Sequence, residues 1–460
     1  MHAVLSPQLQ GKATIWNHAQ QLSWSLFLPA PGTILVVSGH LDYAAMVTLL
    51  LSLVAAFQRG KATNYDPTAG RYSTGLDTIL FVIVAIISAV VLGLQTSPTD
   101  GKLFRLSFTG FAGEEDIRNS FLVLLWTLCL STVPILHRAH PDTSSIGAGF
   151  NKNTAVAMAT LGATGLLLSL TVSRQEVFAS RGESSGNGLN SFLYWSAATF
   201  VAYVIVTHTT KGSRVFPLLA GLMTVGLMAT GNRSPIALLL IAVLVRIIWR
   251  NRRGTLRLAI LLSPLALVLL SYQSVWRARV SRGLPSSPKD VFQILISEPL
   301  QQFLHMGLDT VDGHILTRAI LSAGYSAHWS DPLLAVTNFI PRQIWSQKPI
   351  LLGSQIGHDY LGLTAGGIFL SGPGYFSLVT GSVFLGSAVF IILIMLIKSI
   401  LIIPSLPPLA VCALFYLAVR ISIAGDAFDI FLSLQVLVIF GLSTLLGKVY
   451  RGRDPHSLHS

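Results

Sequence analysis

Charged residues are scarce in this sequence. Asp, Glu, Lys and Arg make up 11% of its 460 residues, and 52% of the residues are hydrophobic. A soluble domain carries about 25% charged residues. Several apolar runs of about 18 residues or more have no charge at their centres, which is typical of transmembrane helices. The composition therefore predicts an all-α, polytopic integral membrane protein.

Cysteine is almost absent as well. The two cysteines, Cys129 and Cys412, both lie within apolar runs, so neither a disulfide framework nor a zinc site is expected. The formal net charge is +12, but the basic residues form no aromatic-interleaved patch of the kind that nucleic-acid-binding modules carry. We therefore expect no nucleic acid partner, and we expect the positive charge to orient helices in a membrane.

The apolar runs predict eleven membrane helices. A bilayer core of about 30 Å requires about 20 apolar residues per helix, so the shorter runs must extend into their flanks. A twelfth helix over Leu22–Val37 is the main alternative, although Pro29 and Pro31 are expected to break it. The predicted cores are Ser38–Phe57, Leu76–Gln95, Ser120–Leu136, Ala155–Val172, Leu189–His208, Val215–Ala229, Ser234–Ile248, Leu256–Tyr272, Ser382–Ile403, Leu409–Ile423 and Phe428–Val449.

The basic residues of the short loops fall mainly on one side of this helix order. The positive-inside rule assigns the richer side, and with it the C-terminus, to the cytoplasm. The richer side holds sixteen: Arg59, Lys61, Arg71, Arg138, Lys152, Lys211, Arg214, Arg246, Arg250, Arg252, Arg253, Arg257, Lys398, Lys448, Arg451 and Arg453. The other side holds eight: Lys12, Lys102, Arg105, Arg118, Arg174, Arg181, Arg233 and Arg420.

One long segment, residues 273–381, falls on the outer side in this prediction. It is far longer than an ordinary connection, and it separates an N-terminal bundle of residues 1–272 from C-terminal helices and a tail in residues 382–460. Its apolar residues recur at helical spacing, which predicts amphipathic helices near the membrane surface. A first run comprises Phe292, Leu295, Ile296, Phe303, Leu304 and Leu308, and a second comprises Val311, Ile315, Leu316, Ala319 and Ile320.

Arg233 is a candidate for binding an anion on the outer side. It stands in a tight turn directly before Ser234 and Pro235, where a helix is predicted to begin. The N-terminus of a helix favours negative charge, so the turn suits a phosphate group. The alternative is that Ser234 and Pro235 only start the helix, and that Arg233 snorkels to the membrane surface.

A second cationic stretch contains Arg342 and Lys348 on either side of Trp345. Arginine can bind phosphate oxygens in bidentate fashion, and lysine adds a point charge. Arg277 and Arg279, which follow the eighth predicted helix, allow the same interpretation. The alternative for all four cations is an interfacial anchor in anionic lipid, with the tryptophan at head-group depth.

Four histidines lie in the long segment: His305, His314, His328 and His358. A neutral imidazole is suited to act as a general base toward a sugar hydroxyl. His358 and His314 are the candidate catalytic residues. The histidine spacing does not match a zinc motif, so we expect no metal.

The Wzy-type family of O-antigen and capsule repeat-unit polymerases, which is related to the O-antigen ligases, resembles this chain. The resemblance rests on the turn around Arg233, on the single large outer loop, and on one motif. The motif is similar to the family's Phe-Ile-Pro-Arg-x-x-Trp-x-x-Lys-Pro pattern and covers Phe339–Pro349. The chain departs from the family at Gly372, which precedes Pro373 where family members often carry a Gly-Glu pair.

The resemblance implies a GT-C-like fold and a glycosyltransferase of the inner membrane that needs no metal or cofactor. Its donor would be a growing glycan on undecaprenyl diphosphate, and its acceptor a single lipid-linked repeat unit. Arg233 and Arg342 would hold the diphosphates, with Arg277, Arg279 and Lys348 in secondary roles. The implied partners, besides membrane lipid, are a chain-length regulator and a flippase.

Two other functions remain open. An O-antigen ligase catalyses the same class of reaction with a different acceptor. A secondary transporter or lipid flippase predicts internal repeats and a polar pathway at mid-membrane depth. The sequence shows no convincing repeat, and the predicted membrane interior is nearly free of charge. Its exception is Arg420, which is expected to pair with Asp426 or Asp429.

Overall fold

The structure is helical, as the composition predicts. The computed structural model describes residues 22–62, 68–96, 114–135, 150–171, 188–208, 214–229, 233–250, 272, 275, 287–297, 311, 313–337, 345, 347, 352–361, 370–403, 406–423, 425 and 427–452. No strand occurs within these ranges.

The long helices follow the predicted apolar runs in order. Each predicted core has its helix except Leu256–Tyr272, of which only Tyr272 lies among the described residues. Several helices extend past their apolar cores into polar residues, most of all α4, which starts at Thr68 and not at the predicted Leu76. Helix α5 instead ends at Ser131, before the predicted Leu136. The helices are α3 (Leu41–Ala62), α4 (Thr68–Thr96), α5 (Glu114–Ser131), α6 (Lys152–Thr171), α8 (Gly188–Thr207), α9 (Val215–Ala229), α10 (Arg233–Arg250), α17 (Val383–Leu401), α18 (Pro408–Ile423) and α19 (Ala427–Gly452).

The stretch Leu22–Val37 is also helical, although its prolines were expected to break it. Residues 22–27 form one helical segment, and α2 (Pro29–Val37) follows after a bend at Leu28. Pro29 opens α2 and Pro31 falls in its first turn, where backbone N–H groups have no partner within the helix. The chain therefore bends at Leu28, and a second helix begins at Pro29, so the stretch remains helical on both sides of the bend.

Four of the described helices are long and apolar enough to cross a membrane, judged by length and composition. Large apolar side chains also face outward, such as Leu218 on α9 (69% exposed) and Phe384 on α17 (81% exposed). Soluble monomers rarely expose extended apolar surfaces of this kind, whereas lipid solvates them. These features indicate a membrane protein. The four apolar stretches are Leu41–Gly60, Tyr72–Leu92, Val383–Leu401 and Ile430–Gly447.

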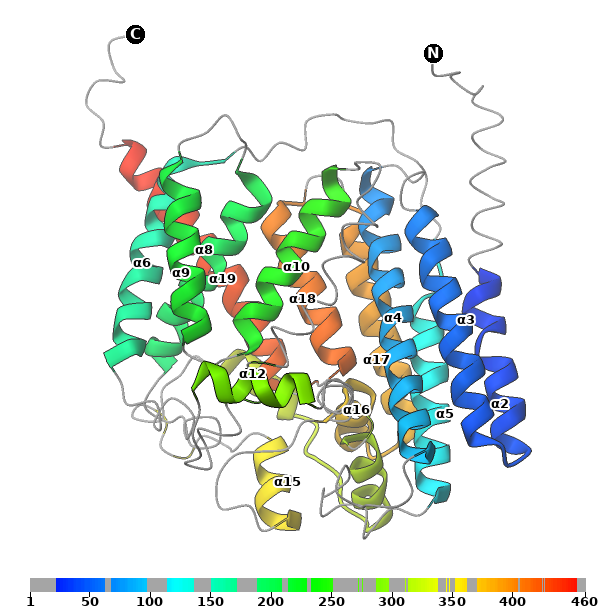
Figure 1. Cartoon of the computed structure of the whole chain (residues 1–460). Helices are drawn as coiled ribbons and strands as arrows, with labels where there is room; N and C mark the ends of the chain where they lie inside the picture. The colour runs from blue at the N-terminus through cyan, green and yellow to red at the C-terminus, as the bar shows by residue number, and fades with distance from the viewer. Residues whose placement is uncertain are drawn as a thin grey trace, which may run out of the picture.

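The long helices lie side by side, and α3, α5, α8, α10, α17 and α19 all end at the end of the bundle that is drawn upward in Figure 1. We call this the upper end. Contacts agree with the picture, because Asn153 at the start of α6 donates to the carbonyl of Gly447 late in α19 (3.4 Å). The positive-inside rule assigned these helix ends to one side of the membrane. In the structure they lie at one end of the bundle.

Short helices from the long segment gather toward the opposite, lower end (Figure 1). They connect the two groups of long helices and supply the candidate histidines. They are α12 (Pro288–Ser297), a helix over residues 313–322, the 3-10 turn η1 (Asp331–Leu333), α14 (Leu334–Thr337), α15 (Leu352–Leu361) and α16 (Gly372–Thr380).

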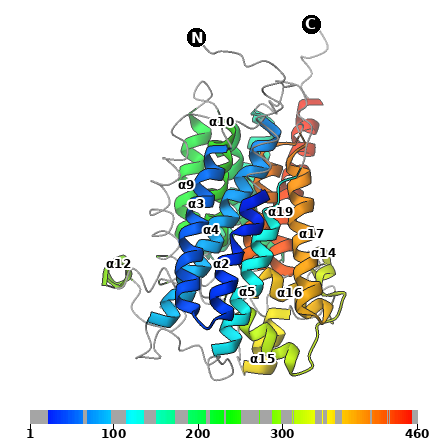
Figure 2. The ribbon, with the colours of Figure 1, turned by 90° about the vertical axis from the view of Figure 1, so that its right-hand side faces the viewer.

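The two predicted amphipathic runs differ in their placement. Helix α12 lies across the direction of the bundle and stands to one side of it in Figure 2, with Phe292 52% and Ile296 73% exposed. This agrees with a surface helix. Residues 313–322 instead bury both Ile315 and Ile320. The apolar side of this helix packs within the protein, and the helix contacts α16 where Gly374 approaches Thr317. Its placement near a membrane surface stays a prediction.

Candidate functional site

Most of the predicted phosphate-binding cations fall outside the described residues. These are Arg277, Arg279, Arg342 and Lys348. Arg233 is the first residue of α10, so the predicted helix start is confirmed, but its side chain lies outside the description. The structure thus places the two candidate catalytic histidines and the backbone of one candidate arginine.

His314 is completely buried in the helix over residues 313–322. Its Nδ1 lies 3.2 Å from the hydroxyl oxygen of Ser371, a residue 57 positions later in the chain. Ser371 is the N-cap of α16, and its hydroxyl also accepts the backbone N–H of Gly374 at 3.1 Å. The site is therefore built where two helices of the long segment meet.

Two glycines let the N-terminus of α16 approach its neighbours closely. A Cβ on Gly374 would lie 2.7 Å from Oγ1 of Thr317, one turn after His314. A Cβ on Gly372 would lie 1.9 Å from the carbonyl oxygen of Ile421 in α18. Pro373 is accommodated because it falls in the first turn of α16. The Gly-Pro-Gly sequence that departs from the family pattern thus has a structural role here.

Burial and charge keep the His314 side chain neutral. Its complete burial, and then the nearby Arg318 guanidinium, lower the pKa of His314 to about 3. Nε2 of His314 has no hydrogen-bond partner among the described residues. A buried polar group without a partner is uncommon in folded proteins, so this nitrogen requires an explanation.

Asp331 and Tyr375 form a second polar contact in this region. The hydroxyl of Tyr375 donates to Oδ2 of Asp331 at 2.6 Å and ties η1 to α16. Burial raises the pKa of Asp331, and the hydrogen bond from Tyr375 opposes that shift. No sequence pattern predicts this pair, because the two residues lie 44 positions apart.

His358 differs from His314 in every respect that matters for proton transfer. It lies on α15, and its side chain is 77% exposed. Its Nδ1 lies 2.9 Å from Oδ1 of Asp359, so Nδ1–H donates to the carboxylate. Nε2 of the neutral ring then carries the lone pair, which is the arrangement of a histidine able to accept a proton.

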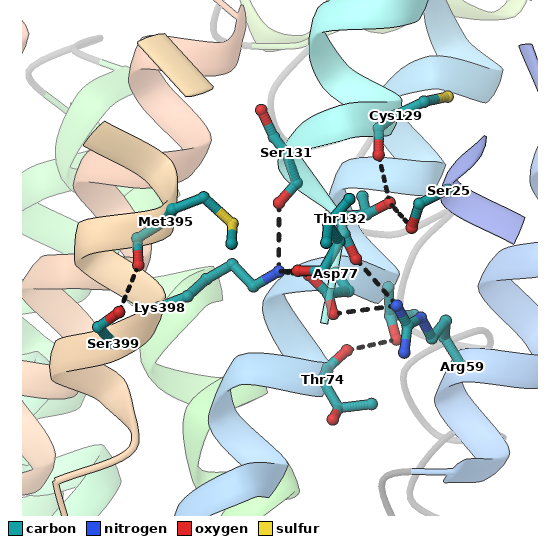
Figure 3. Close-up of polar contacts among 12 residues, drawn as sticks. Ser25, Arg59, Thr74, Asp77, Cys129, Ser131, Thr132, Met395, Lys398 and Ser399 are labelled. Atoms are coloured by element: carbon teal, nitrogen blue, oxygen red, sulfur yellow. Dashed lines mark hydrogen bonds and ion pairs between the residues drawn. The ribbon is translucent and has the colours of Figure 1, made fainter. Parts of the chain in front are cut away.

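A buried ion cluster lies near the upper end, and the sequence did not predict it. It consists of Arg59, Asp77 and Lys398, whose side chains are 1%, 2% and 0% exposed (Figure 3). Nζ of Lys398 lies 2.7 Å from Oδ1 of Asp77, and Nη2 of Arg59 lies 3.4 Å from Oδ2. The cluster joins α3, α4 and α17.

Three consecutive backbone carbonyls at the end of α5 complete the ion cluster. Arg59 donates to the carbonyl of Thr132 at 2.9 Å. Lys398 donates to the carbonyls of Ser131 (3.2 Å) and Val133 (2.7 Å). The negative end of a helix dipole favours cations, so these carbonyls stabilise the two cations beside the Asp77 carboxylate. The cluster has the features of a structural connection between helices.

The ion cluster corrects two predictions from the sequence. Arg59 is predicted to lie in a loop, but it is buried inside α3. Lys398 lies within its predicted helix, but it is buried instead of reaching the membrane surface. The buried part of the bundle is therefore not free of charge. Asp77, which lies within an apolar run, was the signal that could have revealed the cluster, because such a residue requires a partner. The expected partners of Arg420 lie outside the described side chains.

Acid should destabilise the protein through His314. Between about pH 6.5 and pH 3 the unfolded chain binds a proton that the buried ring does not. The contribution to stability is therefore complete above about pH 6.5 and decreases by about 1.4 kcal/mol per pH unit below it. His314→Gln should remove this part of the pH dependence of the melting temperature, and the exposed control His358→Gln should retain it. An unchanged dependence in His314→Gln would mean that protons reach the ring in the folded state.

Comparison with known proteins adds no relative. The chain matches no family model, no curated protein and no solved structure.

Proposed function

We propose that this chain joins lipid-linked oligosaccharide repeat units on the outer face of the inner membrane, as a glycosyltransferase of surface polysaccharide biosynthesis. The observation that carries the proposal is the segment Phe339–Pro349, which repeats the polymerase pattern over its Pro-Arg, Trp and Lys-Pro positions. The apolar helices support it, because both substrates carry polyprenyl chains that require a membrane.

The reaction is a substitution at the anomeric carbon of the donor sugar. The acceptor hydroxyl oxygen forms a bond to that carbon, and the bond from the carbon to the diphosphate oxygen breaks. Undecaprenyl diphosphate leaves with the bonding electrons, and a base takes the hydroxyl proton. Arg233 and Arg342, with Arg277, Arg279 and Lys348, would bind the diphosphates and stabilise the charge that develops on the leaving group.

His358 is the base in this proposal. The hydrogen bond from its Nδ1–H to Asp359 leaves Nε2 free to accept the proton. The carboxylate also stabilises the imidazolium that forms, as an orienting carboxylate does in other proton-transfer pairs. Exposure of the ring favours this role, because the base has to reach a sugar hydroxyl on a bulky substrate.

The positions of the candidate residues support a site at the lower end. Helix α10 begins there with Arg233, and the helices that carry His314 and His358 lie at the same end (Figure 1). In the proposed orientation the upper end, where the helix ends next to the basic short loops lie, faces the cytoplasm. The lower end then faces outward, where lipid-linked repeat units would be available.

Deletion of the gene tests the proposal directly, with surface polysaccharide resolved by size on a gel. A polymerase deletion should remove the ladder of long chains and retain a single repeat on its final acceptor. A ligase deletion should remove all surface glycan and leave polymer on the lipid carrier. A flippase deletion should remove surface glycan and leave single lipid-linked repeats. An unchanged ladder would reject all three functions.

The ion cluster is the observation that favours the transporter alternative. Buried ionisable residues of membrane proteins often lie on ion or proton pathways. Against this, the single carboxylate of Asp77 contacts two cations, which themselves donate to backbone carbonyls. Such a cluster suits a fixed connection better than a site that exchanges ions. The lipid-linked intermediates that accumulate in the deletion strain separate the two functions.

A further inference from the structure

The hydroxyl of Ser371 determines which ring nitrogen of His314 carries the hydrogen. This hydroxyl accepts from Gly374 and has one further described partner, Nδ1 of His314. If Ser371 donates to Nδ1, only Nε2–H lacks a partner among the described residues. If Nδ1–H donates instead, both the Ser371 hydrogen and Nε2 lack one. Each unpaired buried group costs free energy, so the first arrangement, which leaves one such group instead of two, is favoured.

The favoured arrangement makes Nε2 of His314 a hydrogen-bond donor. The ring does not take up a second proton in the physiological range, since burial and Arg318 hold its pKa near 3. A buried N–H without an acceptor is costly, and a ligand oxygen would remove that cost. To reach the nitrogen, the ligand must displace the side chains that cover it.

The charges around His314 favour an anionic oxygen. Arg318 follows one turn later on the same helix, and it is close enough to shift the titration of His314. The N-terminus of α16 contributes the positive end of a helix dipole, and its N-cap is the partner of Nδ1. The Arg318 guanidinium, the N-terminus of α16 and the Nε2–H donor would therefore all stabilise a bound anion.

We propose that the buried Nε2–H of His314 donates a hydrogen bond to an anionic phosphate oxygen, and that His314 is not a general base. The identification of this phosphate with the lipid-linked diphosphate rests on the function proposed above. The two candidate histidines then have opposite roles. Ser371 holds His314 as a donor, and Asp359 holds His358 as a proton acceptor.

Pyrophosphate binding by matched variants tests the proposal. Glutamine places an amide N–H near the position of Nε2, whereas asparagine places one near Nδ1. With the full chain in lipid nanodiscs, the Kd for inorganic pyrophosphate should change less than about threefold in His314→Gln. It should rise about tenfold or more in His314→Asn. A parallel titration with farnesyl diphosphate identifies the source of the phosphate, because tighter binding than pyrophosphate indicates a lipid-linked ligand.

The tautomer can be measured in the wild type, so the test does not depend on the folding of a variant. Nitrogen-15 NMR of histidine-labelled protein should show hydrogen on Nε2 of His314 and on Nδ1 of His358. Hydrogen on Nδ1 of His314 would overturn the proposal. Equal pyrophosphate affinities in wild type, His314→Gln and His314→Asn would also overturn it, as expected if an internal water satisfies the nitrogen.

The outcomes separate this inference from the proposed function. If the site at His314 binds pyrophosphate in the expected variant order but the deletion strain keeps its polysaccharide ladder, the phosphate site stands and the polymerase function fails. If the deletion strain loses the ladder and retains a single repeat on its final acceptor, but the variants bind pyrophosphate equally, the polymerase function stands and His314 has another role.

Discussion

Replacing Asp77 with asparagine should lower the free energy of unfolding by about 3–5 kcal/mol, because it removes the carboxylate that contacts the buried cations Arg59 and Lys398. Unfolding of the purified protein in mixed micelles, followed by circular dichroism, measures the change. The neighbouring Ser399→Ala is the control. Its exposed hydroxyl bonds only to its own helix, so we expect a change below about 0.5 kcal/mol.

A double variant distinguishes the ion cluster from a general packing effect. Lys398→Met removes one of the two cations, and so Asp77→Asn costs less when both changes are combined. We expect the double variant to be more stable than the sum of the single effects by about 1 kcal/mol or more. Additive effects, or a neutral Asp77→Asn, would mean that these side chains do not interact in the folded protein.

Replacing Arg342 with alanine should abolish polymer formation while the amount of protein in the membrane is unchanged. Lysine should restore only a small part of the activity, because it lacks the planar fork that binds two phosphate oxygens at once. The ladder of surface polysaccharide, with membrane protein quantified in the same cells, measures both effects.

Lys289→Ala is the matched control for the loss of a cation. It lies on α12 in the same long segment and its side chain is exposed, so we expect a normal ladder. Full activity in Arg342→Lys would reduce Arg342 to an interfacial anchor, since a head-group contact requires charge but no fixed geometry.

The helices were the most predictable part of the fold, because a long apolar run without central charges indicates a transmembrane helix and shows approximately where it begins and ends. Prolines were harder to interpret. Pro29 is compatible with a new helix only because it falls in the first turn of α2. The position of a proline within a helix could not be predicted from the sequence. In α16, Ser371 is the N-cap and Pro373 falls in the first turn, which is a sequence pattern typical of a helix start.

The polar sites depended on pairings that a single sequence does not show. Lys398 and Ser131 lie 267 positions apart, and positive residues near predicted helix ends are usually loop residues or membrane anchors. The two histidines looked equivalent in the sequence. Their different roles follow from Ser371 and Asp359, and the first of these contacts exists only because α16 packs against the helix of His314.

The most direct test of the polymerase function is reconstitution of the purified full chain in vesicles that contain a single lipid-linked repeat unit. We expect glycans of two or more repeats on the lipid, with one undecaprenyl diphosphate released for each new linkage. The reaction should fail with Arg342→Ala. Unchanged lipid-linked repeats after incubation with folded wild-type protein, and no released diphosphate, would contradict it.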